Sequence, residues 1–263
     1  MKLKIGVMQF NPVHKSILDN LKIFKKLVQL LPQSTQLIVL PEMIFTGYVF
    51  KSKQDIMPFA VDTSAMQLMK ETALVRKCYV AYGAPFLENS KLYNALHLIN
   101  PKGELQFTHK KSHLYELDEP WSEEGPGFFS SELEIENRKL TVSFGICMDM
   151  NPYKFQAPYE SFEFANSCLK HKSDVVICSN AWLHPEQDST DTTVSMSTIQ
   201  YWADRCRPLI GSNAVCVIAN RTGKEEGTKF AGSSCILHLK KRPELLAVIE
   251  HEEDCIYYEV DIV

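Results

Sequence analysis

The sequence predicts an α/β protein, and two observations carry the prediction. Short apolar runs with the length of buried strands alternate with longer segments whose apolar residues recur at helical spacing. The second half of the chain repeats this alternation, and no low-complexity or linker-like stretch interrupts it. A chain of 263 residues can bury one sizeable core, so we expect a single domain over residues 1–263.

The first half of the chain begins with a predicted strand over 3–10, which stops at Asn11-Pro12. A helix is expected over 16–31, because its apolar residues fall on one face and Ser16 can act as an N-cap. The other elements predicted in this half are strand 37–42, helix 64–78 and strands 79–88, 91–100 and 104–110.

The second half is expected to follow the same pattern. The run "LTVSFGICM" over 140–148 reads as a buried strand. The elements predicted after it are a helix at about 159–172, strand 174–182, a helix at about 191–210, strand 213–221 and short strands over 232–239, 245–252 and 255–263.

Composition excludes several classes of protein. The formal net charge is −4, which argues against a nucleic-acid or membrane partner, since either requires a basic face. The eight cysteines are dispersed singly, mostly within apolar runs, which predicts reduced, buried thiols. No run approaches the roughly 20 apolar residues of a membrane span, and the N-terminal run is too short for a signal peptide. We expect a soluble, intracellular protein, cytoplasmic or also nuclear.

Three polar residues of complementary type stand at or near predicted strand ends. Glu42 ends "LIVLPE", Lys111 lies in "THKKSHLYELDEPW", and Cys147 lies in "FGICMDM". Working residues of open α/β sheets collect at the carboxyl ends of strands. A shared site is therefore one interpretation. The alternative is a core cysteine, a capping glutamate and a solvated lysine pair, and spacing alone does not choose Lys111 over Lys110.

A thiol needs a base or a lowered pKa before it attacks a carbonyl carbon. Glu42 can accept its proton if a dry site raises the pKa of the carboxyl. Lys111 can keep a positive charge beside a thiolate, and it can stabilise an oxyanion together with the backbone N–H of Met148. This chemistry needs no metal and no organic cofactor.

Several motifs resemble the nitrilase, or carbon–nitrogen hydrolase, superfamily. "LIVLPEMIFTGY", "KKSHLYELDE" and "FGICMDM" resemble its glutamate, lysine and nucleophile segments, and "SNAWL", "CVIANRTG" and "FAGSS" follow in the family's order. The resemblance implies a four-layer α-β-β-α sandwich that pairs as a homodimer. It also implies hydrolysis of a non-peptide C–N bond through a thioester, with Glu42 as base, Lys111 as oxyanion partner and Cys147 as nucleophile.

The family often uses a second glutamate between the lysine and the cysteine. In "ELDEPW" the best match is Glu119, which in this role would hold Lys111 in place and help relay protons. Glu116, Glu123 and Glu124 lie close enough in the sequence to remain alternatives.

The string "GICMDMNPYKF" resembles one branch, the fungal-type amidases that deamidate Asn or Gln at a protein N-terminus and feed N-degron turnover. Asn151 stands where an arginine is common, which leaves Asp149 without its usual partner. Asp149, or Glu163, is then a candidate reader of the substrate α-amino group. A bond from Asp149 to backbone or to another cation remains the alternative.

Other residues are expected near the substrate. Asn180 and Trp182 follow a buried strand and are candidates for the pocket wall, with packing or a turn role as the alternative. The aromatic run 48–50 is predicted to line the pocket or the core. The polar run "KEEGTK" (224–229) is predicted to be a surface loop, with the edge of the substrate mouth as the other possibility.

Three further functions stay open at this point. Two belong to the same superfamily: a small-molecule ω-amidase and a nitrilase proper. The third is a catalytically silent binding member, against which the intact Glu42, Lys111 and Cys147 argue.

Overall fold

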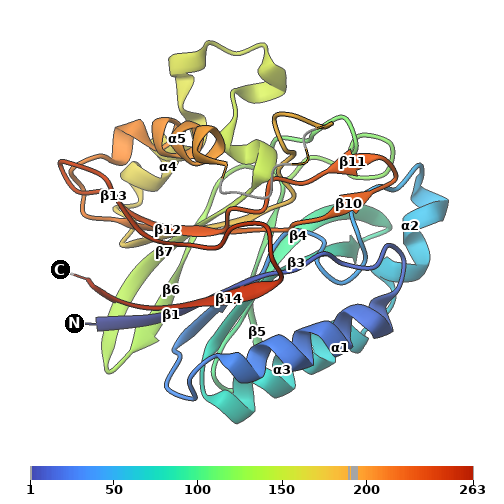
Figure 1. The fold of residues 1–263 in the computed structure, drawn as a ribbon, viewed down its shortest axis with the longest axis horizontal. Coiled ribbons are helices and arrows are strands. Elements are labelled where there is room, and N and C mark those ends of the chain that lie inside the picture. The colour runs from blue at the N-terminus through green and yellow to red at the C-terminus, as the bar shows by residue number, and fades with distance from the viewer. Residues whose placement is uncertain (1, 189, 191–194, 263) are drawn as a thin grey trace.

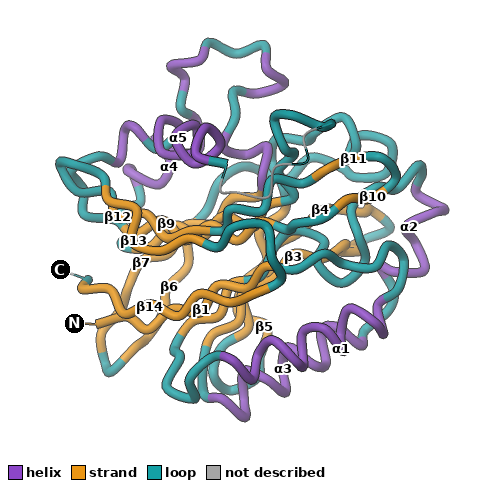
Figure 2. The backbone as a smooth tube through the Cα atoms, viewed as in Figure 1, coloured by secondary structure: helices purple, strands orange, loops and turns teal. Residues whose placement is uncertain are grey.

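The computed structural model describes residues 2–188, 190 and 195–262. Two six-stranded sheets pack face to face, and helices cover the outer face of each sheet (Figures 1 and 2). The predicted four-layer α-β-β-α sandwich is therefore confirmed. The N- and C-terminal strands are neighbours, so the two ends of the chain lie close together (Figure 1).

The first sheet has the strand order β14-β1-β2-β3-β4-β5. Its central strands β1, β2 and β3 are parallel, and the flanking strands pair antiparallel. The strands are β1 (Lys2–Gln9), β2 (Leu37–Val39), β3 (Tyr79–Glu88), β4 (Lys91–Ile99), β5 (Leu105–Lys110) and β14 (Asp254–Asp261), and helices α1 (Ile17–Leu27) and α3 (Ser64–Arg76) cover this sheet.

The second sheet has the order β13-β12-β9-β8-β7-β6 and again contains three central parallel strands, β7, β8 and β9. Its strands are β6 (Ser130–Ile135), β7 (Arg138–Ile146), β8 (Val175–Asn180), β9 (Val215–Asn220), β12 (Cys235–His238) and β13 (Glu244–Val248), and it is covered by α4 (Glu163–Lys170) and α5 (Met196–Arg205). The remaining elements are α2 (Lys53–Ala60) and a hairpin of β10 (Lys224–Glu225) and β11 (Thr228–Lys229).

Apolar side chains form one core between the sheets and one beneath each helical layer. Val39 and Ile177 belong to the central core, Phe24 packs between the first sheet and its helices, and Trp202 packs between the second sheet and its helices. Each of these side chains is fully buried. Removing such apolar area from water is the main favourable term in folding, so the alternating runs of the sequence account for the layers.

Several elements are shorter than predicted. The strand predicted over 37–42 ends at Val39, just before Pro41, which has no N–H for the ladder. The strand predicted over 140–148 ends at Ile146, and a short 3₁₀ turn, η2 (Cys147–Met150), follows it. The helix predicted at 191–210 is α5, which begins at Met196; residues 191–194 lie outside the described ranges.

Four elements were not predicted: α2, β6, β10 and β11. Helix α2 contains Pro58, and the hairpin β10–β11 falls in the run expected to be a loop. Strand β6 turns into β7 at Glu136 and Asn137, whose φ angles of 51° and 63° suit a two-residue hairpin. In the part of the chain that the structure describes, no helix is both long and apolar enough to cross a bilayer.

Candidate active site

A buried group of four polar side chains, which we call the charged cluster, lies between the sheets' carboxyl ends. It consists of Glu42, Asn94, Lys111 and Asp118, all of them 0% exposed. Lys111 Nζ lies 2.7 Å from Glu42 Oε1 and 2.5 Å from Asp118 Oδ2. Asn94 Nδ2 donates to Glu42 Oε1 at 2.6 Å and to Asp118 Oδ1 at 2.9 Å. One lysine is thus held by two carboxylates that share an amide donor.

Glu42 joins the charged cluster to the second sheet. Its Oε2 accepts the backbone N–H of Ala181, just after β8, at 2.7 Å. Burial raises the pKa of the Glu42 carboxyl, although Lys111 beside it acts to lower that pKa. Burial would lower the pKa of Lys111, but Asp118 and Glu42 together raise it above its ordinary value. The site therefore contains a permanent cation and a carboxyl poised to exchange a proton.

Tyr48 completes the surroundings of the lysine. Its hydroxyl donates to Asp118 Oδ2 at 3.3 Å and lies 3.5 Å from Lys111 Nζ. Burial, and then the charges of Asp118 and Glu42, raise the pKa of Tyr48, so its hydroxyl stays protonated. Tyr48 therefore packs against the charged cluster and is not among the residues that line the substrate cavity.

The prediction that Glu119 contacts Lys111 is wrong. The side chain of Glu119 is exposed, and the neighbouring residue, Asp118, contacts Lys111 instead. Asp118 Oδ2 also accepts the backbone N–H of Tyr115 at 3.0 Å, which closes the turn with the aspartate facing inward. A shorter acidic side chain one position earlier thus occupies the place expected for a glutamate.

Cys147 lies at the sharp end of β7 in a left-handed conformation with φ of 42°. Such a conformation is costly for a residue with a side chain and must be held by its surroundings. Asn180 Oδ1 accepts the Cys147 N–H at 2.9 Å. Gly145 allows the turn to pack closely, because a Cβ there would lie 2.7 Å from the Phe164 ring.

The proposal that Asp149 is free to read a substrate ammonium is contradicted, and its structural alternative is confirmed. Asp149 is fully buried and accepts hydrogen bonds from His109 Nε2 and from the backbone N–H groups of Ser112, His113 and Ile146, at 2.8–2.9 Å. Burial opposes its ionisation, but these bonds hold its pKa below the ordinary value. Asp149 thus ties the segment after Lys111 to the turn that carries Cys147.

Glu163 is not at the cavity either. Its Oε1 accepts the Tyr153 N–H at 3.3 Å, and its Oε2 lies 4.0 Å from Arg205 Nη2. Glu163 is not among the cavity-lining residues. The carboxylate therefore belongs to the anchoring of the segment after the nucleophile.

The thiol of Cys147 is neutral at rest. Burial raises its pKa well above the ordinary value, and Glu42 raises it further, while Lys111 and the Ala181 N–H act in the opposite direction. The expected resting thiolate beside Lys111 is not favoured, because the nearby carboxylate outweighs the cation. Attack on a substrate therefore requires that the proton leave the sulfur at the same time.

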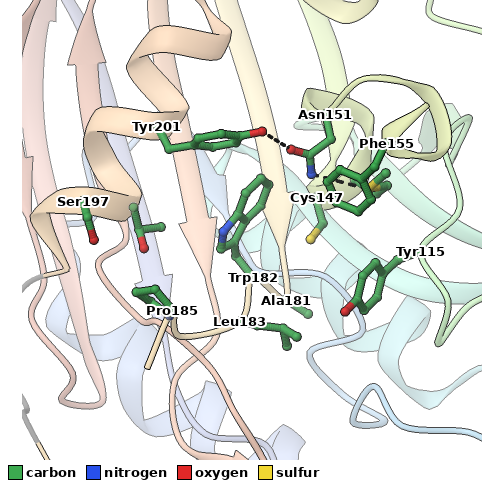
Figure 3. A pocket seen from close by; sticks show the side chains of 12 residues that line it. Tyr115, Cys147, Asn151, Phe155, Ala181, Trp182, Leu183, Pro185, Ser197 and Tyr201 are labelled. Carbon is green, nitrogen blue, oxygen red and sulfur yellow. Dashed lines mark hydrogen bonds between the residues drawn. The ribbon is translucent and has the colours of Figure 1, made fainter. Parts of the chain in front are cut away.

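Cys147 opens into a cavity of about 380 Å³. Figure 3 shows its sulfur directed into this space, with Trp182 and Tyr115 on opposite sides in that view. The lining residues are Tyr115, Cys147, Met148, Asn151, Phe155, Ala181, Trp182, Leu183, Pro185, Ser197, Thr198 and Tyr201. We call this cavity the aromatic pocket, after the rings of Tyr115, Phe155, Trp182 and Tyr201. Among the described residues, no carboxylate lines it.

The structure separates the two residues expected in the pocket wall. Trp182 does line the aromatic pocket, and its ring centroid lies 5.7 Å from that of Tyr201. Asn180 is fully buried and holds the Cys147 backbone instead. Asn151, which stands where an arginine is common, accepts a hydrogen bond from the Tyr201 hydroxyl at 2.7 Å (Figure 3).

Met148 supplies a candidate oxyanion donor. It is the second residue of the η2 turn, and the first N–H groups of a helical turn have no acceptor within it. Its side chain lines the aromatic pocket beside Cys147. A metal is not indicated in the described ranges, where no group of three or more His, Cys, Asp or Glu side chains is arranged to hold one.

Asn94 and Asp118 were not predicted as site residues. Asp118 contacts Lys111, and Asn94 donates to both carboxylate partners of that lysine. Asn94 is a polar residue within the apolar run "LYNALHLI", and a polar residue in a buried strand needs a hydrogen-bonding partner. Asp118 stands next to Glu119, the residue predicted to hold Lys111. Both signals were available in the sequence, although neither identifies the partner.

The chain is similar to known proteins over almost its whole length. A family model described as carbon-nitrogen hydrolase matches residues 4–262. A Schizosaccharomyces pombe protein named protein N-terminal amidase is 36% identical over 270 residues, which cover 93% of this chain and 94% of that protein.

Two crystal structures of N-terminal amidase share the fold. One contains an Asn-Glu-Ala peptide and has a TM-score of 0.87, covering 98% of this chain and 97% of that chain. The other contains a Gln-Val peptide and has a TM-score of 0.86, covering 99% of both chains. Both are 23% identical to this chain, and at that level of identity the similarity shows only that the fold is shared.

Proposed function

Because the chain belongs to the carbon-nitrogen hydrolase family, whose members hydrolyse C–N bonds, we propose that it deamidates Asn or Gln at the N-terminus of a protein or peptide. The products are Asp or Glu and ammonia. The observation that carries this proposal is a cysteine that opens into the aromatic pocket together with Ala181, whose backbone N–H donates to Glu42 of the charged cluster. Similarity to the fission-yeast amidase supports the choice of substrate.

Acylation begins when the Cys147 sulfur attacks the side-chain amide carbon and its proton passes to Glu42. The carbonyl oxygen becomes an oxyanion, which Lys111 and the Met148 N–H stabilise. When the C–N bond breaks, Glu42 returns the proton to the leaving nitrogen, and ammonia departs. Burial raises the pKa of the Glu42 carboxyl, which makes it a stronger base than an ordinary glutamate and suits it to both transfers.

Deacylation uses the same residues in reverse. Glu42 takes a proton from a water molecule, and the hydroxide attacks the thioester carbon. The C–S bond breaks, the sulfur recovers the proton from Glu42, and the acid product leaves. Asp118 and Asn94 keep Lys111 and Glu42 in place through both halves of the reaction.

Recognition of the free α-amino group falls to the aromatic pocket. The carboxylates of Asp149 and Glu163 are engaged elsewhere. The rings of Trp182 and Tyr201 offer faces that attract a cation, and the Asn151 amide oxygen is a neutral acceptor beside them. The absence of an arginine at position 151 disfavours substrates that present a carboxylate there.

Mass spectrometry of a small peptide panel tests this function. Asn- and Gln-initiated peptides should be converted to the acids, while their N-acetylated forms and peptides with internal Asn should not. Free glutamine, a 2-oxo-amide and a nitrile serve as the arms for an ω-amidase and a nitrilase. Faster turnover of any of these, or equal rates on free and acetylated peptides, would contradict the proposal.

The cellular setting belongs to the same proposal. We expect a homodimer in the cytoplasm, or also the nucleus, whose Asp and Glu products feed N-degron turnover. All eight cysteines are free, which suits a reducing compartment. Sedimentation of the purified protein would test the dimer, since a monomer at micromolar concentration would contradict it.

A further inference from the structure

The hairpin β10–β11 inserts a carboxylate into the segment that follows Glu42. Glu225 Oε1 accepts the backbone N–H of Tyr48 at 2.8 Å and that of Val49 at 2.7 Å. Glu225 is only 5% exposed, although it lies in a run expected to be a surface loop. Two backbone donors converging on one buried carboxylate fix the course of this segment.

A buried arginine completes the arrangement. Arg221 Nη1 donates to Glu225 Oε2 at 2.5 Å, and the guanidinium stacks over the Phe230 ring at 3.9 Å. Arg221 is 0% exposed. It follows β9 at the same end of the second sheet as Cys147 and Asn180. The ion pair therefore lies behind the active site and not at the surface.

The segment after Glu42 is shaped to admit this carboxylate. Gly47 has φ of 82°, and a Cβ there would lie 2.8 Å from Glu225 Oε2 and 2.7 Å from the His14 ring. The other titratable groups facing Glu225 are His14, whose Nε2 lies 3.6 Å away and donates to the Val49 carbonyl, and Glu226, 3.6 Å from His14 Nδ1. Position 47 thus requires both glycine's freedom and its lack of a side chain.

Through Tyr48 the hairpin reaches the charged cluster. Tyr48 packs edge-on against Phe230, with ring centroids 6.2 Å apart, and its hydroxyl contacts Asp118 and Lys111. A chain of direct contacts therefore runs from Arg221 and Glu225 to Lys111.

We infer that Glu225 is a positioning residue for the reaction, acting on the catalytic groups from outside the aromatic pocket. It holds Tyr48 against Lys111, and it neutralises Arg221 so that no uncompensated positive charge stands near Glu42. Arg221 also lies close to Glu42 along the backbone. Its N–H donates to the Asn180 carbonyl at 3.2 Å, and the next residue, Ala181, donates to Glu42, so the charge of Glu42 acts on Arg221. The titratable groups that interact electrostatically with Glu42 are Lys111, Asp118, Cys147, Tyr48 and Arg221. This inference rests on the proposed function only for the choice of assay.

The test compares Glu225→Gln, Glu225→Asp and Glu226→Gln with wild type. For Glu225→Gln we expect kcat to fall by about 10- to 100-fold with KM unchanged, because the catalytic groups shift while the pocket is intact. The acid limb of the pH–rate profile should also move to lower pH, because unpaired Arg221 favours the ionised form of Glu42. Glu225→Asp keeps the charge but not the reach, so its kcat should fall without a shift of the limb.

Glu226→Gln is the matched control, since its side chain is half exposed in the same hairpin, and it should behave as wild type. Thermal unfolding of each variant separates positioning from folding. The inference is overturned if the acid limb of Glu225→Gln does not move, or if its loss of activity follows the unfolded fraction.

A second readout keeps this test independent of the proposed function. If wild type converts no Asn or Gln peptide, the proposed function fails, and the inference is judged by the pH dependence of Cys147 alkylation. A shift in Glu225→Gln but not in Glu226→Gln would support the positioning role, and identical profiles in both variants would refute it.

Discussion

The charged cluster and the aromatic pocket meet at Cys147 but are built in opposite ways. Lys111 and Asp118 are fully buried and their charged atoms contact one another at hydrogen-bonding distance. The pocket is lined by the ring of Tyr115, which follows β5 of the first sheet, and by rings from the second-sheet side, among them Phe155, which is 61% exposed. Under the proposed function, we expect the buried part to carry out the hydrolysis and the exposed apolar part to select the amide substrate.

The energetic consequences differ as well. Removing one member of a buried ion pair leaves an uncompensated charge and typically costs about 3–5 kcal/mol. Trimming an exposed ring removes contact area and leaves no unpaired group behind. Substitutions in the charged cluster should therefore impair both stability and catalysis, whereas those in the aromatic pocket should chiefly change substrate binding.

The largest loss of activity is expected for substitution of Cys147, which lies between the charged cluster and the aromatic pocket. Cys147→Ala removes the nucleophile, and turnover of an Asn-initiated peptide should fall by roughly 10⁴-fold or more. Ammonia release measures it. Cys255→Ala, on the distant strand β14, is the control and should keep its activity. Substantial turnover by Cys147→Ala would remove the sulfur from the mechanism.

Within the charged cluster, Asp118→Asn should lower kcat by about 10²-fold, because Lys111 loses one of its two carboxylates. Glu119→Gln makes the same carboxylate-to-amide change at the exposed neighbouring residue and should not change kcat. Steady-state kinetics on both variants decide between the two positions. If Glu119→Gln lowered kcat more than Asp118→Asn, Glu119 would be the residue that holds Lys111, as the family resemblance indicates.

The pH dependence tests the cluster's base. Glu42 must be ionised to accept the thiol proton, and burial raises its pKa, so the acid limb of kcat/KM should lie above about 4.3, the ordinary glutamate value. Below that limb the rate should fall about tenfold per pH unit. In Glu42→Gln the limb should disappear from the residual activity. A limb at or below the ordinary value would contradict the assigned base.

The smallest effect is expected in the aromatic pocket. Phe155→Ala should raise KM for an Asn-peptide by about 3- to 10-fold with kcat nearly unchanged, since the ring contributes contact area only. Leu169→Ala, an exposed apolar residue of α4 that does not line the pocket, is the control. A drop in kcat without a change in KM would show that the pocket also orients the reacting groups.

The layers of the fold could be predicted because apolar periodicity reflects burial. The ends of the elements were harder to predict. Strand β7 ends at Ile146, whose N–H donates to Asp149, and the alternation of apolar residues carries no information about this contact. The hairpin β10–β11 was expected to be a surface loop because it is polar. Glu225 of this hairpin can be buried because Arg221 and two backbone N–H groups donate to its carboxylate.

The site was predictable where a residue type is rare in its setting. Glu42 and Cys147 stand out as polar groups at predicted strand ends, whereas Lys111 was preferred to Lys110 only through the family resemblance. The structure brings Glu42 and Lys111 into contact. The choice between Glu119 and Asp118 depends on which way a tight turn faces, and spacing does not fix that. Asp149 was a candidate substrate contact because Asn151 replaces the usual arginine. Its actual partners, His109 and two backbone N–H groups, come from a segment far away in the sequence.

We expect the acyl group of the substrate amide to pass to the sulfur of Cys147, with ammonia as the leaving group. Rapid quenching of the wild-type protein with an Asn-peptide, followed by mass spectrometry of its fragments, measures this directly. We expect an adduct of substrate less ammonia on the fragment containing Cys147, and none on the other cysteines. Continued turnover with no adduct at Cys147, or with an adduct elsewhere, would contradict the account.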